Sequence, residues 1–297
     1  EERRDLVASN IMGSLIVTTV VCGVLAVVVE RLFFGGTPLL YRLLMIAAFV
    51  TMCDLWVVVI VLTGLKAYNK IVVAFFVAYL IVVGGGMLLV DYGLSGLLAS
   101  FVAGQVVLLF LLLAILLKEY DAPRFASFEF LDKTQVFVSL SFTGFMYNLA
   151  IWADKFCFWY HPVTGEPAIG PLRASVVYDT PIFLAYLTII PGMSVFLVRM
   201  ETDFADLYER FYDGVRNGAA LEELERLRDQ MIATVRQGIY EIFKVQGLTV
   251  VLMLIIGPLL LDALGLSRLH QGLFYVDCVG EAAQVLMLAI LTIAFYL

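Results

Sequence analysis

The 297-residue sequence predicts an all-α fold, a polytopic helical bundle that spans a membrane. Hydrophobic residues make up 62% of the chain and charged residues only 15%, whereas a soluble domain is about half apolar and a quarter charged. Mean hydropathy is +0.96, and apolar runs long enough for a spanning helix recur along the whole sequence. These observations exclude an ordinary soluble enzyme, and the net charge of −7 argues against a basic nucleic-acid-binding protein.

Eight apolar runs predict eight spans, and none of them shows the strict alternation typical of a membrane β-barrel strand. The runs lie at 11–29, 39–63, 71–90, 92–117, 134–160, 176–198, 243–262 and 276–297. The sequence begins without Met and ends inside an apolar run. We therefore expect the chain to be a fragment of a longer protein.

The distribution of Lys and Arg predicts the orientation of these spans. Fourteen of the 19 basic residues fall on the side of the N-terminal stretch, and four fall on the opposite side. The basic side is cytoplasmic by the positive-inside rule. The connections at 64–70, 118–133 and 200–240 are therefore expected in the cytoplasm.

Two polar connections predict the organisation of the chain. The segment 118–133 is predicted to link two lobes, with four spans in 1–117 and four in 134–297. The segment of about 200–240 is predicted to form two amphipathic helices that break at Asn217-Gly218. This hairpin is interpreted either as a solvated cap on the bundle or as a docking site for a cytoplasmic partner.

The fifth span carries the main candidates for a substrate path. Asn148, Trp152, Lys155 and Trp159 are spaced by four, three and four residues, which places them on one helical face. Indole rings can stack on the apolar faces of sugars, while polar groups bond hydroxyls. Alternatively, Trp159 belongs to an interfacial aromatic belt and Lys155 extends toward the membrane surface. Asp154 is a further path candidate, but it lies about 100° around the helix from Lys155 and need not pair with it.

Asp54 lies midway along the second span and is also a path candidate. A carboxylate inside a membrane is ion-paired, protonated or in contact with a water path. Two hypotheses stay open, namely proton coupling and structural pairing, for example with Lys155.

The connection at 161–175 is expected on the outer side and is rich in Pro and Gly. Glu166, Arg173 and Tyr178 are candidates for an outer vestibule, and Asp179 is a candidate for the path behind it. An ordinary turn-rich loop is the alternative.

Proline and glycine predict bends within the spans. Pro191-Gly192 should break the sixth span, Gly257-Pro258 is a second possible kink in the seventh, and Gly84-Gly85-Gly86 allows close helix contact or bending in the third.

The sequence shows no pattern typical of an enzyme or a metal site. It contains no Walker A, H-E-x-x-H or G-x-S-x-G motif, and its four cysteines form no C-x-x-C pair. We therefore expect no catalytic residues, no cofactor and no metal.

The stretch from the fifth to the sixth span resembles the PelG family of the Pel exopolysaccharide system. The resemblance rests on five blocks, which are ADKF (153–156), TGE (164–166), GPLRAS (170–175), YDTPIFLAYL (178–187) and PGMSVFLVRMETDF (191–204). PelG-like proteins are similar to polysaccharide transporters of the MOP exporter superfamily. The resemblance thus implies a twelve-span, two-lobe transporter, of which this chain would hold spans three to ten.

The resemblance implies that the chain translocates a Pel-like amino-sugar polymer across the bacterial inner (plasma) membrane. The expected partners are this polysaccharide, the lipid bilayer, a PelF-like cytoplasmic glycosyltransferase and PelD-like and PelE-like membrane proteins, with no nucleic acid. Two alternatives stay open. One is a cation-coupled MOP-type exporter of small molecules or lipid-linked oligosaccharides, and the other is a scaffold that assembles a synthase complex.

Overall fold

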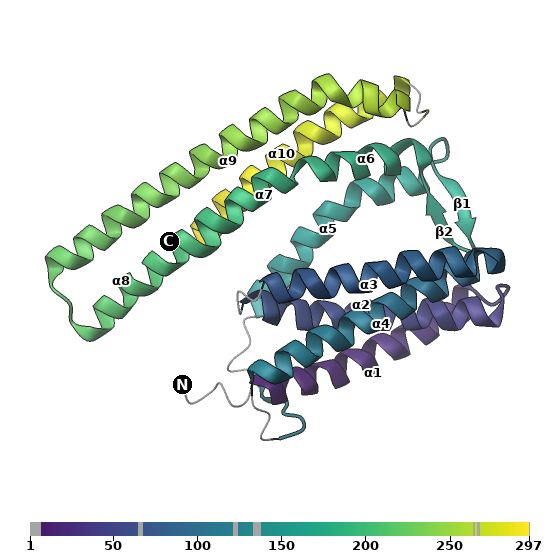
Figure 1. Cartoon of the computed structure of the whole chain (residues 1–297), viewed down its shortest axis with the longest axis horizontal. Helices are drawn as coiled ribbons and strands as arrows, with labels where there is room; N and C mark the ends of the chain where they lie inside the picture. The colour runs from purple at the N-terminus through teal and green to yellow at the C-terminus, as the bar shows by residue number, and fades with distance from the viewer. Residues whose placement is uncertain are drawn as a thin grey trace. The chain divides into compact units, whose positions relative to one another are not determined.

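The computed structural model describes residues 7–64, 68–120, 124–132, 138–263, 265 and 268–296, and almost all of them are helical (Figure 1). The predicted all-α bundle is confirmed. The α-helices are α1 (Val7–Phe33), α2 (Leu39–Gly64), α3 (Tyr68–Leu89), α4 (Gly93–Glu119), α5 (Val138–Tyr160), α6 (Val176–Thr188), α7 (Ile190–Phe196), α8 (Ala205–Asn217), α9 (Leu221–Ala263) and α10 (Arg268–Tyr296). Short 3₁₀ turns lie at Val90–Tyr92 and Glu129–Leu131.

The chain divides into two compact units, and each is described by itself. The first unit comprises Glu1–Leu149 and Ala168–Leu172, and the second comprises Ala150–Pro167 and Arg173–Leu297. The lobe boundary at 118–133 stays a prediction. Parts of the predicted cytoplasmic connections at 64–70 and 118–133, including Lys66, Pro123 and Lys133, lie outside the described residues.

In the first unit, α1 to α4 pack around a core of aliphatic side chains from all four helices. Small residues bring α3 and α4 close together. A Cβ at Gly104 would lie 2.3 Å from a Val82 methyl group, and one at Gly85 would lie 2.7 Å from Ser100 Oγ. The triple-glycine prediction is thus confirmed for Gly85, whereas nothing lies within 4 Å of a Cβ at Gly84.

In the second unit, α10 packs against α6 and α9, and the sixth span is broken between α6 and α7. The two parts meet at a bend of 40°. Pro191 has no N–H to donate to the carbonyl of Leu187, which interrupts the helical ladder. Near this break, Nε2 of the buried Gln246 donates to the carbonyl of Thr188 at 3.1 Å. The predicted break at Pro191 is confirmed. By contrast, α9 continues as one helix through Pro258.

The segment 200–240 folds into two helices that are joined at Gly218. A π-helix (Leu197–Phe204) continues into α8, and Gly218 ends α8 in the left-handed conformation with φ of 72°. The second amphipathic segment is not a separate helix, because α9 runs without a break from Leu221 into the seventh apolar run. Arg199 anchors the base of this hairpin through Nε, which donates to Glu241 at 2.6 Å.

Five helical segments of the described chain are long and apolar enough to cross a membrane, or six if the bent pair of α6 and α7–α8 is one span. One of the five, Asn69–Glu119, contains both α3 and α4. The chain is therefore a helical membrane protein, while the count of eight spans is not confirmed.

The connection at 161–175, which is predicted on the outer side, contains a β-hairpin that the sequence did not indicate. Strands β1 (Glu166–Ile169) and β2 (Leu172–Ala174) pair around Gly170, whose φ is 58°. A side-chain hydrogen bond holds the segment between α5 and β1, because Thr164 Oγ1 donates to the Phe158 carbonyl at 2.8 Å.

Candidate functional site

The C-terminal half of α5 brings aromatic and charged side chains together with residues of α6 and α10. α5 has little apolar periodicity, and its last three turns carry Trp152, Asp154, Lys155, Phe156 and Trp159. All five belong to the second unit. This cluster is the candidate functional site.

Lys155 lies inside the site and is only 7% exposed. Its Nζ donates to the Ile151 carbonyl at 2.9 Å and pairs with Asp154 Oδ1 at 3.2 Å. The ammonium group also lies 5.7 Å from the ring centroid of Trp152 and 5.1 Å from that of Tyr186. Both distances suit cation–π attraction.

Lys155 is less exposed than the tryptophan on its predicted face of α5. It is 7% exposed, whereas Trp152 is 46% exposed. The flexible lysine side chain also reaches the neighbouring Asp154, a pairing that the spacing of the two residues did not require.

Asp154 connects α5 to α6. Its Oδ2 accepts a hydrogen bond from the hydroxyl of Tyr178, which is buried. The Tyr178 ring stacks on Phe158 with centroids 4.0 Å apart and planes 3° apart. Tyr178, which was predicted to line an outer vestibule, is therefore an interior residue that holds Asp154 in place.

Trp159 forms a second connection between the same two helices. Its Nε1 donates to Asp179 Oδ1 at 2.8 Å, and the other oxygen of Asp179 accepts from the Ser175 amide at 2.9 Å. Asp179 thus caps the first turn of α6 and also orients the indole.

Three aromatic rings form a continuous face on α5. Trp152 and Phe156 are each 46% exposed, and Trp159 is half-buried. The ring centroids are 6.4 Å apart for Trp152 and Phe156, 5.8 Å for Phe156 and Trp159, and 6.2 Å for Trp152 and Trp159. We call these three residues the aromatic face. The sequence pattern had identified the two tryptophans but not Phe156.

Two buried carboxylates of α10 complete the site, and the sequence reasoning missed both. Asp277 is 9% exposed and Glu281 is 3% exposed, and they share one face of α10 because they are four residues apart. Both interact electrostatically with Asp154 and Lys155. The overlooked signal was a pair of acids within the apolar run 276–297, which is rare in a membrane span unless the acids have a role.

The remaining predicted residues lie elsewhere. Asp54 is 7% exposed in the first unit, where Thr19 Oγ1 donates to its Oδ2 at 2.8 Å, and its Oδ1 has no partner among the described residues. Asp54 and Lys155 belong to different units, so their pairing stays a prediction. Asn148 is exposed and its amide donates to the Gly144 carbonyl at 2.9 Å.

The two other vestibule candidates belong to the hairpin of β1 and β2. Glu166 is exposed at the start of β1. Arg173 Nη2 donates to the Gly165 carbonyl at 3.0 Å, so this side chain fastens the hairpin. Whether any predicted path residue contacts a substrate stays a prediction.

The site combines an apolar stacking surface with a polar interior. Lys155 is the cation of this interior. It forms an ion pair with Asp154 and interacts electrostatically with Asp277 and Glu281. Such a site can offer ring faces to the C–H surface of a sugar, and charged acceptors and donors to its hydroxyl or amino groups. In the part of the chain that the structure describes, no group of three or more His, Cys, Asp or Glu side chains is placed to hold a metal ion.

Comparison with known proteins identifies the family. A family model matches residues 1–297, and its description is "PelG: Putative exopolysaccharide Exporter (EPS-E)". Neither the curated proteins nor the solved structures contain a match to the chain. Because the family model covers the whole sequence, the chain belongs to the PelG family of exopolysaccharide exporters.

Proposed function

We propose that this chain carries an amino-sugar exopolysaccharide across the bacterial inner membrane, and that the polymer passes the aromatic face of α5. Membership of an exporter family supports the transport role. The observation that carries the location is the contact between Trp152 and the buried Lys155, which joins the aromatic face to the charged interior. The protein moves the polymer without altering its bonds, and is thus not an enzyme.

Within this proposal, the two parts of the site act differently. The rings of Trp152, Phe156 and Trp159 form a sequence-tolerant stacking surface, which lets successive sugars slide past. Lys155 and the three carboxylates hold the surrounding helices in register and offer polar contacts in a region without bulk water.

Complementation of a deletion strain tests this location. Trp152→Ala should lower the amount of secreted polymer several-fold, because it removes one stacking ring. Phe142→Ala is the matched control, since Phe142 is an exposed aromatic residue of the same helix outside the aromatic face. Both variants must be present in the membrane at the wild-type level.

Three outcomes of that experiment are informative. A loss of secreted polymer with Trp152→Ala, but not with Phe142→Ala, supports the proposed path. Equal secretion by both variants contradicts the aromatic face but leaves transport in place. Unchanged polymer in the deletion strain itself contradicts the transport function of this chain.

We also infer that the hairpin of α8 and the first half of α9 faces the cytoplasm and docks the synthase. The proposed partners are a PelF-like glycosyltransferase and PelD-like and PelE-like membrane proteins. Exposed charges on both helices support this role, among them the pairs Arg216–Asp213 and Arg228–Asp229. Removal of 205–236 should abolish co-purification of the glycosyltransferase while the remaining chain stays in the membrane.

A cation-coupled exporter is the second candidate function, and a scaffold without a transport path is the third. The buried Oδ1 of Asp54, which has no partner among the described residues, favours coupling, because such an oxygen is suited to a proton or a small cation. Asp54→Asn should then abolish transport at every pH, whereas normal transport by this variant contradicts coupling at Asp54. The scaffold requires export to survive when the aromatic face is blocked and to fail when the hairpin is removed.

A further inference from the structure

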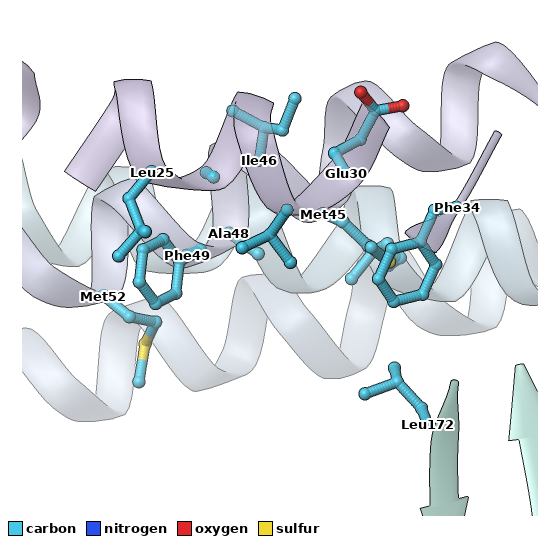
Figure 2. A pocket seen from close by; sticks show the side chains of 12 residues that line it. Leu25, Glu30, Phe34, Met45, Ile46, Ala48, Phe49, Met52 and Leu172 are labelled. Carbon is cyan, nitrogen blue, oxygen red and sulfur yellow. The ribbon is translucent and has the colours of Figure 1, made fainter. Parts of the chain in front are cut away.

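An elongated apolar pocket lies in the first unit, whereas the candidate site belongs to the second unit (Figure 2). Its volume is about 620 Å³, within the range of small-molecule and lipid sites. Leu25, Phe49 and Met52 lie at one end, and Glu30 and Phe34 lie at the other end beside Leu172. The wall residues Leu25 to Phe34 extend about 14 Å along α1, so the pocket follows the helix axis.

The lining has the character of the bilayer interior. It consists mainly of aliphatic, aromatic and methionine side chains from α1 and α2, with Phe34 just after α1, Leu98 from α4 and Leu172 from β2. Among the lining residues that the structure describes, Glu30 alone carries a charge. Both α1 and α2 are long and apolar enough to cross a membrane, so hydrocarbon is the available filling rather than water.

One arginine lies directly beyond the charged end. Arg42 precedes Met45 and Ile46 by one turn of α2, and its Nε donates to Glu30 Oε1. This bond leaves the two Nη groups for another acceptor, because the residues that the structure describes provide Arg42 with no further one. A guanidinium with free Nη groups is suited to a phosphate.

Glu30 and Arg42 also lie at the end of the membrane span. α1 ends at Phe33 and α2 begins at Leu39, so this ion pair is within about one turn of the connection between the two helices. This depth is where a lipid headgroup meets its chains. The apolar pocket therefore begins at headgroup level and runs inward.

We propose that this pocket binds one acyl chain of a bilayer phospholipid, with the lipid phosphate beside Arg42. The proposal does not depend on the transported substrate. It assigns α1 and α2 a lipid site that is separate from the polymer path proposed on α5.

Photolabelling tests the site. The full-length protein in lipid nanodiscs is exposed to a phospholipid that carries a diazirine within one acyl chain, and labelled peptides are identified by mass spectrometry. We expect label to concentrate on the peptides that contain Leu25 and Met52. Ala48→Trp should fill the pocket and lower that label about tenfold, the change expected when roughly two methylene groups lose their contacts.

Val28→Trp is the matched control, because Val28 is an exposed residue of α1 outside the pocket. It should leave the label unchanged. Ala26→Trp fills the pocket from the other helix and replaces Ala48→Trp if that variant does not fold.

Competition distinguishes binding of the acyl chain from binding of the headgroup. Unlabelled phospholipid should displace the probe better than diacylglycerol with the same chains. Arg42→Gln should remove this difference.

Two results would overturn the proposal. One is label spread over all apolar helices that neither Ala48→Trp nor Ala26→Trp reduces, which indicates bulk lipid only. The other is a crosslink from the pocket residues to another part of the protein, which indicates that a protein helix fills the pocket.

Discussion

At the scale of single residues, Lys155 shows how a membrane protein retains a charge in its interior. The ammonium group has a carboxylate, a backbone carbonyl and two aromatic rings around it. Removal of one partner from a buried pair leaves the other uncompensated, at a cost of roughly 3 kcal/mol. Lys155→Met should therefore lower the free energy of unfolding by about that amount in detergent, measured by chemical denaturation.

A second variant identifies the cause of this loss. Asp154→Asn combined with Lys155→Met removes both charges of the pair and should recover part of the lost stability. If the double variant is less stable than Lys155→Met, lost packing rather than an unpaired carboxylate explains the effect.

The two tryptophans of the aromatic face differ in one bond. Trp159→Phe keeps a ring but loses the bond from Nε1 to Asp179, and should lower the free energy of unfolding by about 2 kcal/mol. Trp152→Phe is the matched change, because Trp152 Nε1 has no partner among the residues that the structure describes. Thermal unfolding should separate the two variants, and equal melting temperatures would contradict a structural role for the Trp159–Asp179 bond.

At the scale of helices, glycine positions that look alike in sequence differ in their surroundings. Gly104→Ala should lower the free energy of unfolding by about 1–3 kcal/mol, because the new methyl group would meet Val82 and the Ala78 carbonyl. Gly84→Ala meets nothing and should raise it by about 0.5–1 kcal/mol through helix propensity. Both variants are compared by denaturant unfolding, and the same sign for both would contradict the close α3–α4 packing.

The helices themselves were largely predictable from the long apolar runs. Inside a membrane, the backbone N–H and C=O groups of such a run form all their hydrogen bonds only when the run is helical. The break at Pro191 was also predictable from local sequence, because proline has no N–H to donate within a helix. The hairpin of β1 and β2 was not predictable, because residues 161–175 contain three prolines and two glycines and have no alternating pattern. The continuity of α9 was missed because its sequence changes from amphipathic to apolar within one helix.

Residues of the candidate site were open to prediction one helix at a time, but their meeting in one cluster was not. The spacing of Trp152 and Trp159 identified α5, but partners from other helices depend on tertiary packing, which one sequence does not reveal. Asp277, Glu281 and Tyr178 thus acquire their positions from α10 and α6. The bond of Arg173 to Gly165 is local, and the place of this residue in a vestibule stays a prediction.

At the scale of the whole molecule, the basic-residue distribution predicts which ends of the helices face the cytoplasm. Leu221→Cys and Val163→Cys place thiols at exposed positions on the two expected sides, in a background in which the four native cysteines are replaced by Ala. A membrane-impermeant maleimide should label Val163→Cys in spheroplasts and Leu221→Cys only in inverted vesicles. The reverse pattern would contradict the proposed orientation and the cytoplasmic docking of the hairpin.

The continuity of α9 has a mechanical consequence. Its 43 residues form a rod of about 64 Å, roughly twice the thickness of the hydrocarbon core. A continuous helix transmits tilt and torque along its length, whereas a chain with a flexible joint at the membrane surface would absorb them. A force applied to α9 near Leu221 is therefore transmitted to Gln246, which bonds the bent sixth span at Thr188.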